Sequence, residues 1–129
     1  VVPHVRYTAV GINFRFAIEL DDADAYLKAQ FLKDGAWDSE ENPMKSVGLK
    51  FVYPVTTGRL VLSIDSGIVE TVVDERVHQK PVIIANANFH RDLDTTKLPT
   101  SEQVPNYLDE APGDWDRFSR LVSDMLPNE

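Results

Sequence analysis

The chain has 129 residues, of which 43% are hydrophobic and 26% charged, a balance typical of one globular domain and unlike that of a disordered or membrane-spanning chain. Its formal net charge is −8 and its 13 basic residues are scattered, so a nucleic acid or an anionic membrane would be repelled over most of the surface. The chain contains no cysteine, which excludes disulfides, thiolate metal sites and cysteine nucleophiles.

The chain starts at Val1 without an initiator methionine, and a strand pattern follows within a few residues. Either residues were removed from its start or the domain was cut from a longer protein, and we favour the second. We expect residues 1–129 to form a single domain in the cytoplasm, because the sequence has no secretory leader and no apolar run of about 18 residues.

Hydrophobic periodicity predicts a long first strand followed by a helix. Residues 10–20 alternate apolar and polar side chains, which is typical of a strand with one face in a core. We expect both main helices to cover Phe14 and Phe16 on the apolar face. Within residues 20–35 the apolar spacing becomes helical, with aspartates suited to the start of a helix and Gly35 to its end.

Four further strands are predicted, separated by residues typical of turns. Their patterns cover residues 47–55, 59–65, 68–73 and 81–89. The first two form a hairpin around residues 56–58, and Pro54 belongs to a sheet edge or a strand end because proline cannot donate to a ladder. Residues 66–67, Ser-Gly, predict another turn.

The last predicted helix is the clearest in the sequence. Its apolar residues recur at spacings of three and four from Trp115 to Met125, with Asp114 as the expected N-cap. Residues 92–113 are predicted as a loop with one helical turn near residues 101–108. The order strand, helix, four strands, helix predicts an α+β fold: a mostly antiparallel sheet of about five strands with the two main helices packed on one face.

Residues 90–93, His-Arg-Asp-Leu, match a run in the catalytic loop of protein kinases. Kinases also carry an asparagine five residues after the aspartate, and here that position is Lys97. A glycine-rich phosphate loop, a strand lysine and an Asp-Phe-Gly run are missing as well. We therefore interpret residues 90–93 as a strand that passes into a polar loop.

Other catalytic patterns are also incomplete. Residues 65–67, Asp-Ser-Gly, follow apolar residues as in aspartic proteases, but no apolar-apolar-Gly strand comes later, so a tight turn is the simpler interpretation. Asp92 and Asp94 beside His90 could form only a weak oxygen-rich site. We predict no metal site, no cofactor and no catalytic residue, since a nucleophile elbow and a phosphate loop are absent from the sequence.

One polar surface is predicted from the first strand and residues 81–89. Its members are Asn13, Arg15, Asn86, Asn88 and His90, which form one patch if the two strands are neighbours. Asparagine is a poor strand former, so its repetition here has a cause. The patch is either a sheet face wetted by solvent or a surface for a ligand or partner, with Tyr53 or Trp37 as possible anchors.

These patterns support two hypotheses from different classes. The first is a non-catalytic binding or assembly module whose open sheet face or edge strand pairs with a protein partner or with a second copy, so that a homodimer is one outcome. The second is a small hydrolase or isomerase that uses His90 with Asp92 or Asp65 as acid and base.

Overall fold

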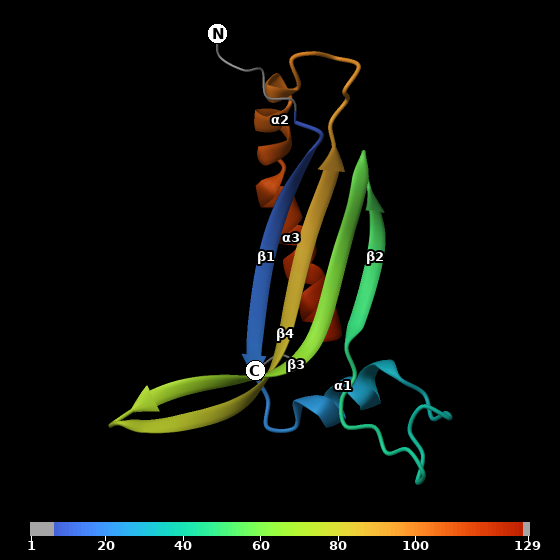
Figure 1. Cartoon of the computed structure of the whole chain (residues 1–129), viewed down its shortest axis with the longest axis vertical. Helices are drawn as coiled ribbons and strands as arrows, with labels where there is room; N and C mark the ends of the chain where they lie inside the picture. The colour runs from blue at the N-terminus through green and yellow to red at the C-terminus, as the bar shows by residue number, and fades with distance from the viewer. Residues whose placement is uncertain (1–6, 128–129) are drawn as a thin grey trace. The chain divides into compact units, whose positions relative to one another are not determined.

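The computed structural model describes residues 7–127 and shows an α+β fold with a four-stranded antiparallel sheet (Figure 1). The strands lie in the order β1-β4-β3-β2. The elements in chain order are β1 Ala9–Glu19, α1 Ala23–Phe31, β2 Leu49–Val55, β3 Gly58–Val73, β4 Arg76–Asp92, the 3-10 turn η1 Thr100–Glu102, α2 Val104–Leu108 and α3 Ala111–Met125. The predicted fold class is confirmed, with one strand fewer than expected. No helix within residues 7–127 combines the length and the apolar character needed to cross a membrane.

Contacts divide the chain into two compact units, and every strand contributes to both. The first unit comprises the described parts of residues 1–14, 51–62 and 87–129, and therefore holds α2 and α3. The second unit comprises residues 15–50 and 63–86, and therefore holds α1 and the turn between β3 and β4.

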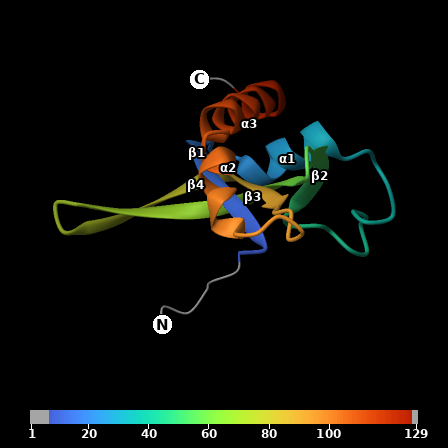
Figure 2. The same cartoon turned by 90° about the horizontal axis from the view of Figure 1, so that it is seen from above.

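In the first unit, α3 lies across one face of the strands (Figure 2). Phe118 of α3 is buried and stacks on Phe14 of β1 with ring centroids 5.8 Å apart. Phe14 also meets Trp115 at 5.4 Å and Phe89 of β4 at 5.9 Å, both edge to face. Phe14 therefore packs beneath α3, because the alternation of β1 points its even-numbered side chains at the helix.

In the second unit, α1 begins where the sequence predicts. The Asp22 carboxylate accepts a hydrogen bond from the backbone N–H of Ala25 at 3.1 Å, so Asp22 caps the helix. Leu27 on the inner side of α1 is fully buried, and Phe16 of β1 is half-buried. The helix ends at Phe31, before the stop that Gly35 predicts.

The turn predicted at residues 66–67 is wrong, because β3 continues through both residues as extended backbone. A side chain at Gly67 would meet the Ile84 side chain at 2.8 Å, which explains a glycine inside this strand. The chain reverses instead at Asp74 and Glu75, whose φ angles of 51° and 63° are those of a two-residue hairpin turn. The third and fourth predicted strands are therefore one strand, and the fifth is longer than expected.

Asp114 is not the N-cap of α3. The helix begins about one turn earlier at Ala111, with Glu110 at the cap position and a proline in the first turn, where no hydrogen bond is lost. Asp114 lies within the first turn and is buried. The error arose because an aspartate before an apolar run has the same local appearance whether it caps the helix or points into the core.

Candidate functional site

The predicted polar surface is partly assembled in the first unit. The Asn88 side-chain amide donates a hydrogen bond to the Asn13 carbonyl oxygen at 2.7 Å, so these two residues face each other across β1 and β4. The same register pairs Leu93 with Thr8, through a backbone hydrogen bond of 2.9 Å. The condition set for the patch, that the first and fifth predicted strands are neighbours, is therefore met.

His90 lies on the same face of β4 as Asn88, two residues further along. Its Nε2 atom lies 3.0 Å from Oδ1 of Asp92, while 28% of the imidazole remains exposed. Asp92 is the last residue of β4. His90 and Asp92 thus form a surface pair at the point where the strand passes into the loop.

The other residues of the predicted patch belong to the second unit. Arg15 of β1 and Asn86 of β4 are both exposed there. Asp65, the other carboxylate considered for acid-base chemistry, also lies in the second unit, next to Gly48. Only Asn13, Asn88 and His90 of the predicted patch share the first unit.

The two candidate anchors have different surroundings. Tyr53 of β2 is half-buried and lies beneath α3, where the Arg117 guanidinium stands 5.8 Å from its ring centroid. Trp37 is 54% exposed, and its indole covers the space beside Gly35. Tyr53 is therefore part of the helix-covered side of the first unit, whereas Trp37 belongs to the second.

The outer edge of β1 is open. Among the described strands β1 has one neighbour, β4. The backbone bonds from Leu93 to Thr8 and from Leu20 to Pro81 involve the residues that flank β1, and these have the parity of its even-numbered residues. In an antiparallel strand the odd-numbered residues then direct their N–H and C=O groups outward. In the described part of the chain no strand pairs with those groups.

The opposite edge of the sheet, β2, differs in composition. It carries Pro54, which has no N–H to donate, and Lys50, and both residue types discourage strand addition. The segment Ala9–Glu19 has neither proline nor lysine, and its outward-directed positions include Gly11. The two edges are thus unequal in proline and lysine, although the odd-numbered positions of β1 also include the charged residues Arg15 and Glu19.

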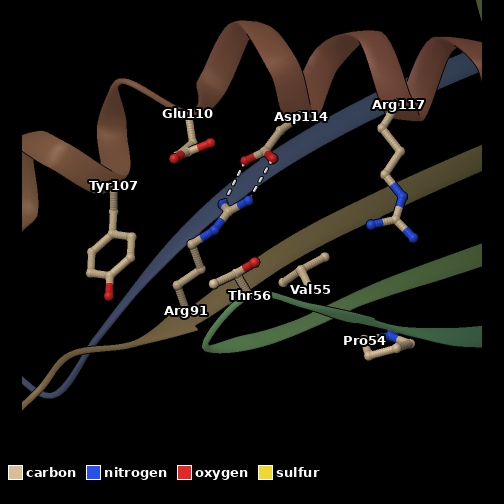
Figure 3. Close-up of a pocket in the computed structure, with 8 residues that line it drawn as sticks. All are labelled: Pro54, Val55, Thr56, Arg91, Tyr107, Glu110, Asp114 and Arg117. Atoms are coloured by element: carbon tan, nitrogen blue, oxygen red, sulfur yellow. Dashed lines mark hydrogen bonds and ion pairs between the residues drawn. The ribbon is translucent and has the colours of Figure 1, made fainter.

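A cavity of about 470 Å³ lies within the first unit, between α3 and the β2–β3 turn (Figure 3). Its lining residues are Pro54, Val55, Thr56, Arg91, Tyr107, Glu110, Asp114 and Arg117. Arg91 and Asp114 form a bidentate ion pair with both N–O distances at 2.7 Å, and both side chains are less than one tenth exposed. The hydrogen bonds to Asp114 raise the pKa of Arg91 above its ordinary value, although burial opposes this shift.

The remaining groups of the cavity carry balanced charge. Because Asp114 neutralises Arg91, one acid, Glu110, and one base, Arg117, are left in the lining. The Tyr107 hydroxyl lies 3.4 Å from Thr57 Oγ1 at the exposed side. A lining of this kind exerts no strong attraction on either an anion or a cation.

Sequence reasoning missed this cavity, although one signal was available. Along β4 the residues with buried side chains include Ala85, Ala87 and Phe89, and the same alternation continues to Arg91. An inward-pointing arginine needs a carboxylate partner. Arg91 was considered only as part of the kinase-like run, and its partner is 23 residues away in α3.

Comparisons with models of known protein families, with curated proteins and with solved structures found no match. Within the described residues, no group of three or more histidines and carboxylates lies close enough together to hold a metal ion.

Proposed function

We propose that this domain is a non-catalytic binding or assembly module in which the outer edge of β1 receives a strand from a protein partner. The observation that carries the proposal is the 11-residue β1 at the end of the sheet, with the N–H and C=O groups of its odd-numbered residues unpaired by any described strand. An unpaired edge of this length is a template for strand addition, in which main-chain hydrogen bonds supply the affinity.

The side chains next to that edge can discriminate between partner strands. Asn13 is at an outward-directed position of β1, and its side-chain oxygen is held by Asn88. An added strand would run beside Asn13, so a polar side chain on the partner could complete this hydrogen-bonded row. The contrast with β2, which carries Pro54 and Lys50, supports one-sided addition at β1.

Two matched variants separate edge binding from face binding. Ala17→Pro removes an outward-directed N–H of β1, and a proline is tolerated there because edge strands accept it. Asn86→Lys changes the open face of the interior strand β4 and leaves the β1 edge intact. Purified wild-type and variant proteins would be used to recover partners from cells of the source organism, followed by amide hydrogen exchange on the complex.

We expect a partner that Ala17→Pro loses and Asn86→Lys keeps, with slowed exchange at the odd-numbered amides of residues 9–19 in the complex. A partner that binds Ala17→Pro as well as wild type, or a failure to recover any partner, contradicts strand addition at β1. Loss of binding with Asn86→Lys alone would instead assign the contact to the open face.

One observation supports a second candidate function, a small hydrolase or isomerase: the contact of 3.0 Å between His90 Nε2 and Asp92 Oδ1. A carboxylate that orients an imidazole is a common arrangement in acid-base catalysis. Neither residue lines the cavity next to Arg91. A panel of ester and isomerase substrates, tested on wild type, His90→Asn and the control His78→Asn, distinguishes this function by selective loss in His90→Asn.

A further inference from the structure

The cavity in the first unit has a buried ion pair, Arg91 with Asp114, in its lining. Two N–H groups of the Arg91 guanidinium donate to the Asp114 carboxylate. A guanidinium has further N–H groups, and those of Arg91 have no protein acceptor within residues 7–127. Because unpaired donors are costly on a side chain that is less than one tenth exposed, an acceptor inside the cavity would be favoured.

The other two charged residues of the lining flank this pair. Glu110 stands at the N-cap position of α3 and Arg117 lies further along the same helix. Figure 3 shows Glu110 and Arg117 on opposite sides of the Arg91–Asp114 pair, both directed toward the strands. No described residue forms an ion pair with either of them, although the Arg117 guanidinium stands 5.8 Å from the Tyr53 ring centroid. A carboxylate and a guanidinium thus border one cavity without pairing with each other.

The cavity is therefore polarised along α3. Besides the hydrogen bonds to Asp114, the charge of Glu110 raises the pKa of Arg91, so Glu110 lies within Coulombic range of that guanidinium. Asp114 and Glu110 together outweigh Arg91 at one end of the cavity, whereas Arg117 is the charged residue at the other end. A negative end and a positive end suit a ligand that carries both signs.

Ligands with only one charge fit this lining less well. A carboxylate placed between Arg91 and Arg117 would satisfy free N–H groups but would leave the Glu110 carboxylate unpaired beside a second anion. An amine at Glu110 would leave those N–H groups without an acceptor. A zwitterion with an ammonium and a carboxylate pairs with both ends at once.

The spacing along α3 sets the length of such a ligand. An α-helix rises about 1.5 Å per residue, so the segment from Glu110 to Arg117 spans roughly 10 Å. Charge-assisted hydrogen bonds of about 2.8 Å at both ends leave roughly 5 Å between the ammonium and the carboxylate. Short ω-amino acids such as 4-aminobutanoate have this length, whereas the two charges of an α-amino acid are closer together.

The opposite side of the cavity can hold the alkyl part of that ligand. Pro54 and Val55 of β2 lie across from α3 (Figure 3) and present carbon atoms to the cavity. The volume of about 470 Å³ is within the range of small-molecule sites and exceeds that of a short ω-amino acid. Water therefore shares the cavity with the ligand, which keeps the contact weak.

We propose that the cavity between α3 and the β2–β3 turn binds a short ω-amino acid, with its carboxylate between Arg91 and Arg117 and its ammonium on Glu110. This site is separate from the β1 edge, and either can exist without the other. Because Glu110 and Arg117 are exposed, their ion pairs are screened by solvent, and the dissociation constant is on the order of 1 mM.

An NMR titration of the ¹⁵N-labelled protein at constant ionic strength tests the proposal with three probes. 4-Aminobutanoate carries both charges, whereas butanoate and butylammonium each carry one of them on a chain of the same length. Each probe is added to about 20 mM, well above the expected dissociation constant. The backbone amides of Thr56, Arg91 and Asp114 report on the cavity.

Two variants remove the charges of the cavity, and two matched variants remove the same charges elsewhere on α3. Glu110→Gln and Arg117→Gln change the cavity, whereas Asp116→Asn and Arg120→Gln change residues outside its lining. All four positions are exposed, so every variant is expected to keep a urea midpoint close to that of wild type.

We expect 4-aminobutanoate to shift the cavity amides and to bind the wild type about fivefold more tightly than either single-charge probe. Glu110→Gln and Arg117→Gln should each weaken 4-aminobutanoate by a similar factor, and the control variants should leave its affinity unchanged. Glu110→Gln should also bind butanoate more tightly than the wild type does, because a carboxylate that repels the anion is gone.

Three outcomes would overturn the proposal. The first is the absence of any shift at the cavity amides with 4-aminobutanoate up to about 20 mM. The second is a single-charge probe that binds the wild type as tightly as 4-aminobutanoate does. The third is a loss of affinity in Asp116→Asn or Arg120→Gln as large as the loss in the cavity variants.

Discussion

Removal of the Asp114 carboxylate should cost this protein more stability than any other single charge change in its first unit. Asp114→Ala leaves the Arg91 guanidinium, less than one tenth exposed, without its bidentate partner. Breaking a buried pair from one side typically costs 3–5 kcal/mol, because the remaining charge stays desolvated. The cavity beside the pair admits water to Arg91, so we place the loss near the lower end, at about 3 kcal/mol.

Urea unfolding followed by circular dichroism measures this loss, and a fall in the melting temperature of about 10–15 °C should accompany it. Asp116→Ala is the matched control, because Asp116 is exposed on the same helix and its removal should change stability by no more than about 0.5 kcal/mol. Replacing both partners, Arg91→Met with Asp114→Leu, should recover most of the loss, since no uncompensated charge remains. An Asp114→Ala protein within about 1 kcal/mol of wild type refutes this reasoning.

The pH dependence provides an independent check of the same pair. The hydrogen bonds to Asp114 raise the pKa of Arg91 in the folded state above its ordinary value. A raised pKa gives stability that is fully present below the unfolded value and is lost only as pH rises through the folded one. The difference in stability between wild type and Asp114→Ala should therefore be the same at pH 7 and at pH 10.

Two further predictions concern backbone space and one loop carboxylate. Gly58→Ala should lower the free energy of unfolding by about 2 kcal/mol or more, because the new methyl group would overlap the backbone of residues 90–91. Gly113→Ala should raise the free energy of unfolding by about 0.5–1 kcal/mol, because alanine favours a helix and a Cβ at this position of α3 meets open space. The urea midpoints of the two variants measure both effects. Hydrogen bonds from the Thr96 hydroxyl and N–H lower the pKa of Asp94, so its contribution to stability is present above the ordinary value of 3.8 and lost as pH falls through the lowered one. Thr96→Val should raise the pKa of Asp94 in a carboxyl NMR titration, and an unchanged titration contradicts the assignment.

The sequence predicted those elements whose burial pattern repeats at short range. β1 was expected at residues 10–20 and runs from Ala9 to Glu19, because alternate side chains enter a core on one face only. The apolar face of α3 was expected from Trp115 to Met125 for the corresponding helical reason. In both cases the pattern is a direct consequence of which side of the element is covered.

The sequence misled where one local pattern has two physical meanings. A Ser-Gly pair suits a tight turn, but it also suits a strand in which a neighbouring side chain, here that of Ile84, takes the space beside the glycine. Asp114 fits a helix cap and equally fits the core once Arg91 faces it. The deciding partners lie 17 and 23 residues away in the chain, so no local rule could separate the alternatives.

For the candidate site, the alternation of buried and exposed side chains along β4 was more informative than the kinase-like run at residues 90–93. Odd-numbered residues of β4 from 83 to 91 point into the core, so in the kinase-like run Arg91 points inward while His90 and Asp92 point outward. This parity separates a residue that stabilises the first unit from two residues on its open face. The adjacency of Asn13 and Asn88 followed from the same parity once β1 and β4 were taken as neighbours.

The strands β3 and β4 have 16 and 17 residues, whereas β1 and β2 have 11 and 7. Ser66 and Gly67 are both compatible with a turn, which is why a turn was predicted there. A reversal at these two residues would remove Val82 and Ile83 from the sheet, and both side chains are buried. The core therefore requires β3 and β4 to continue past residues 66–67, although every residue from 68 to 80 is exposed.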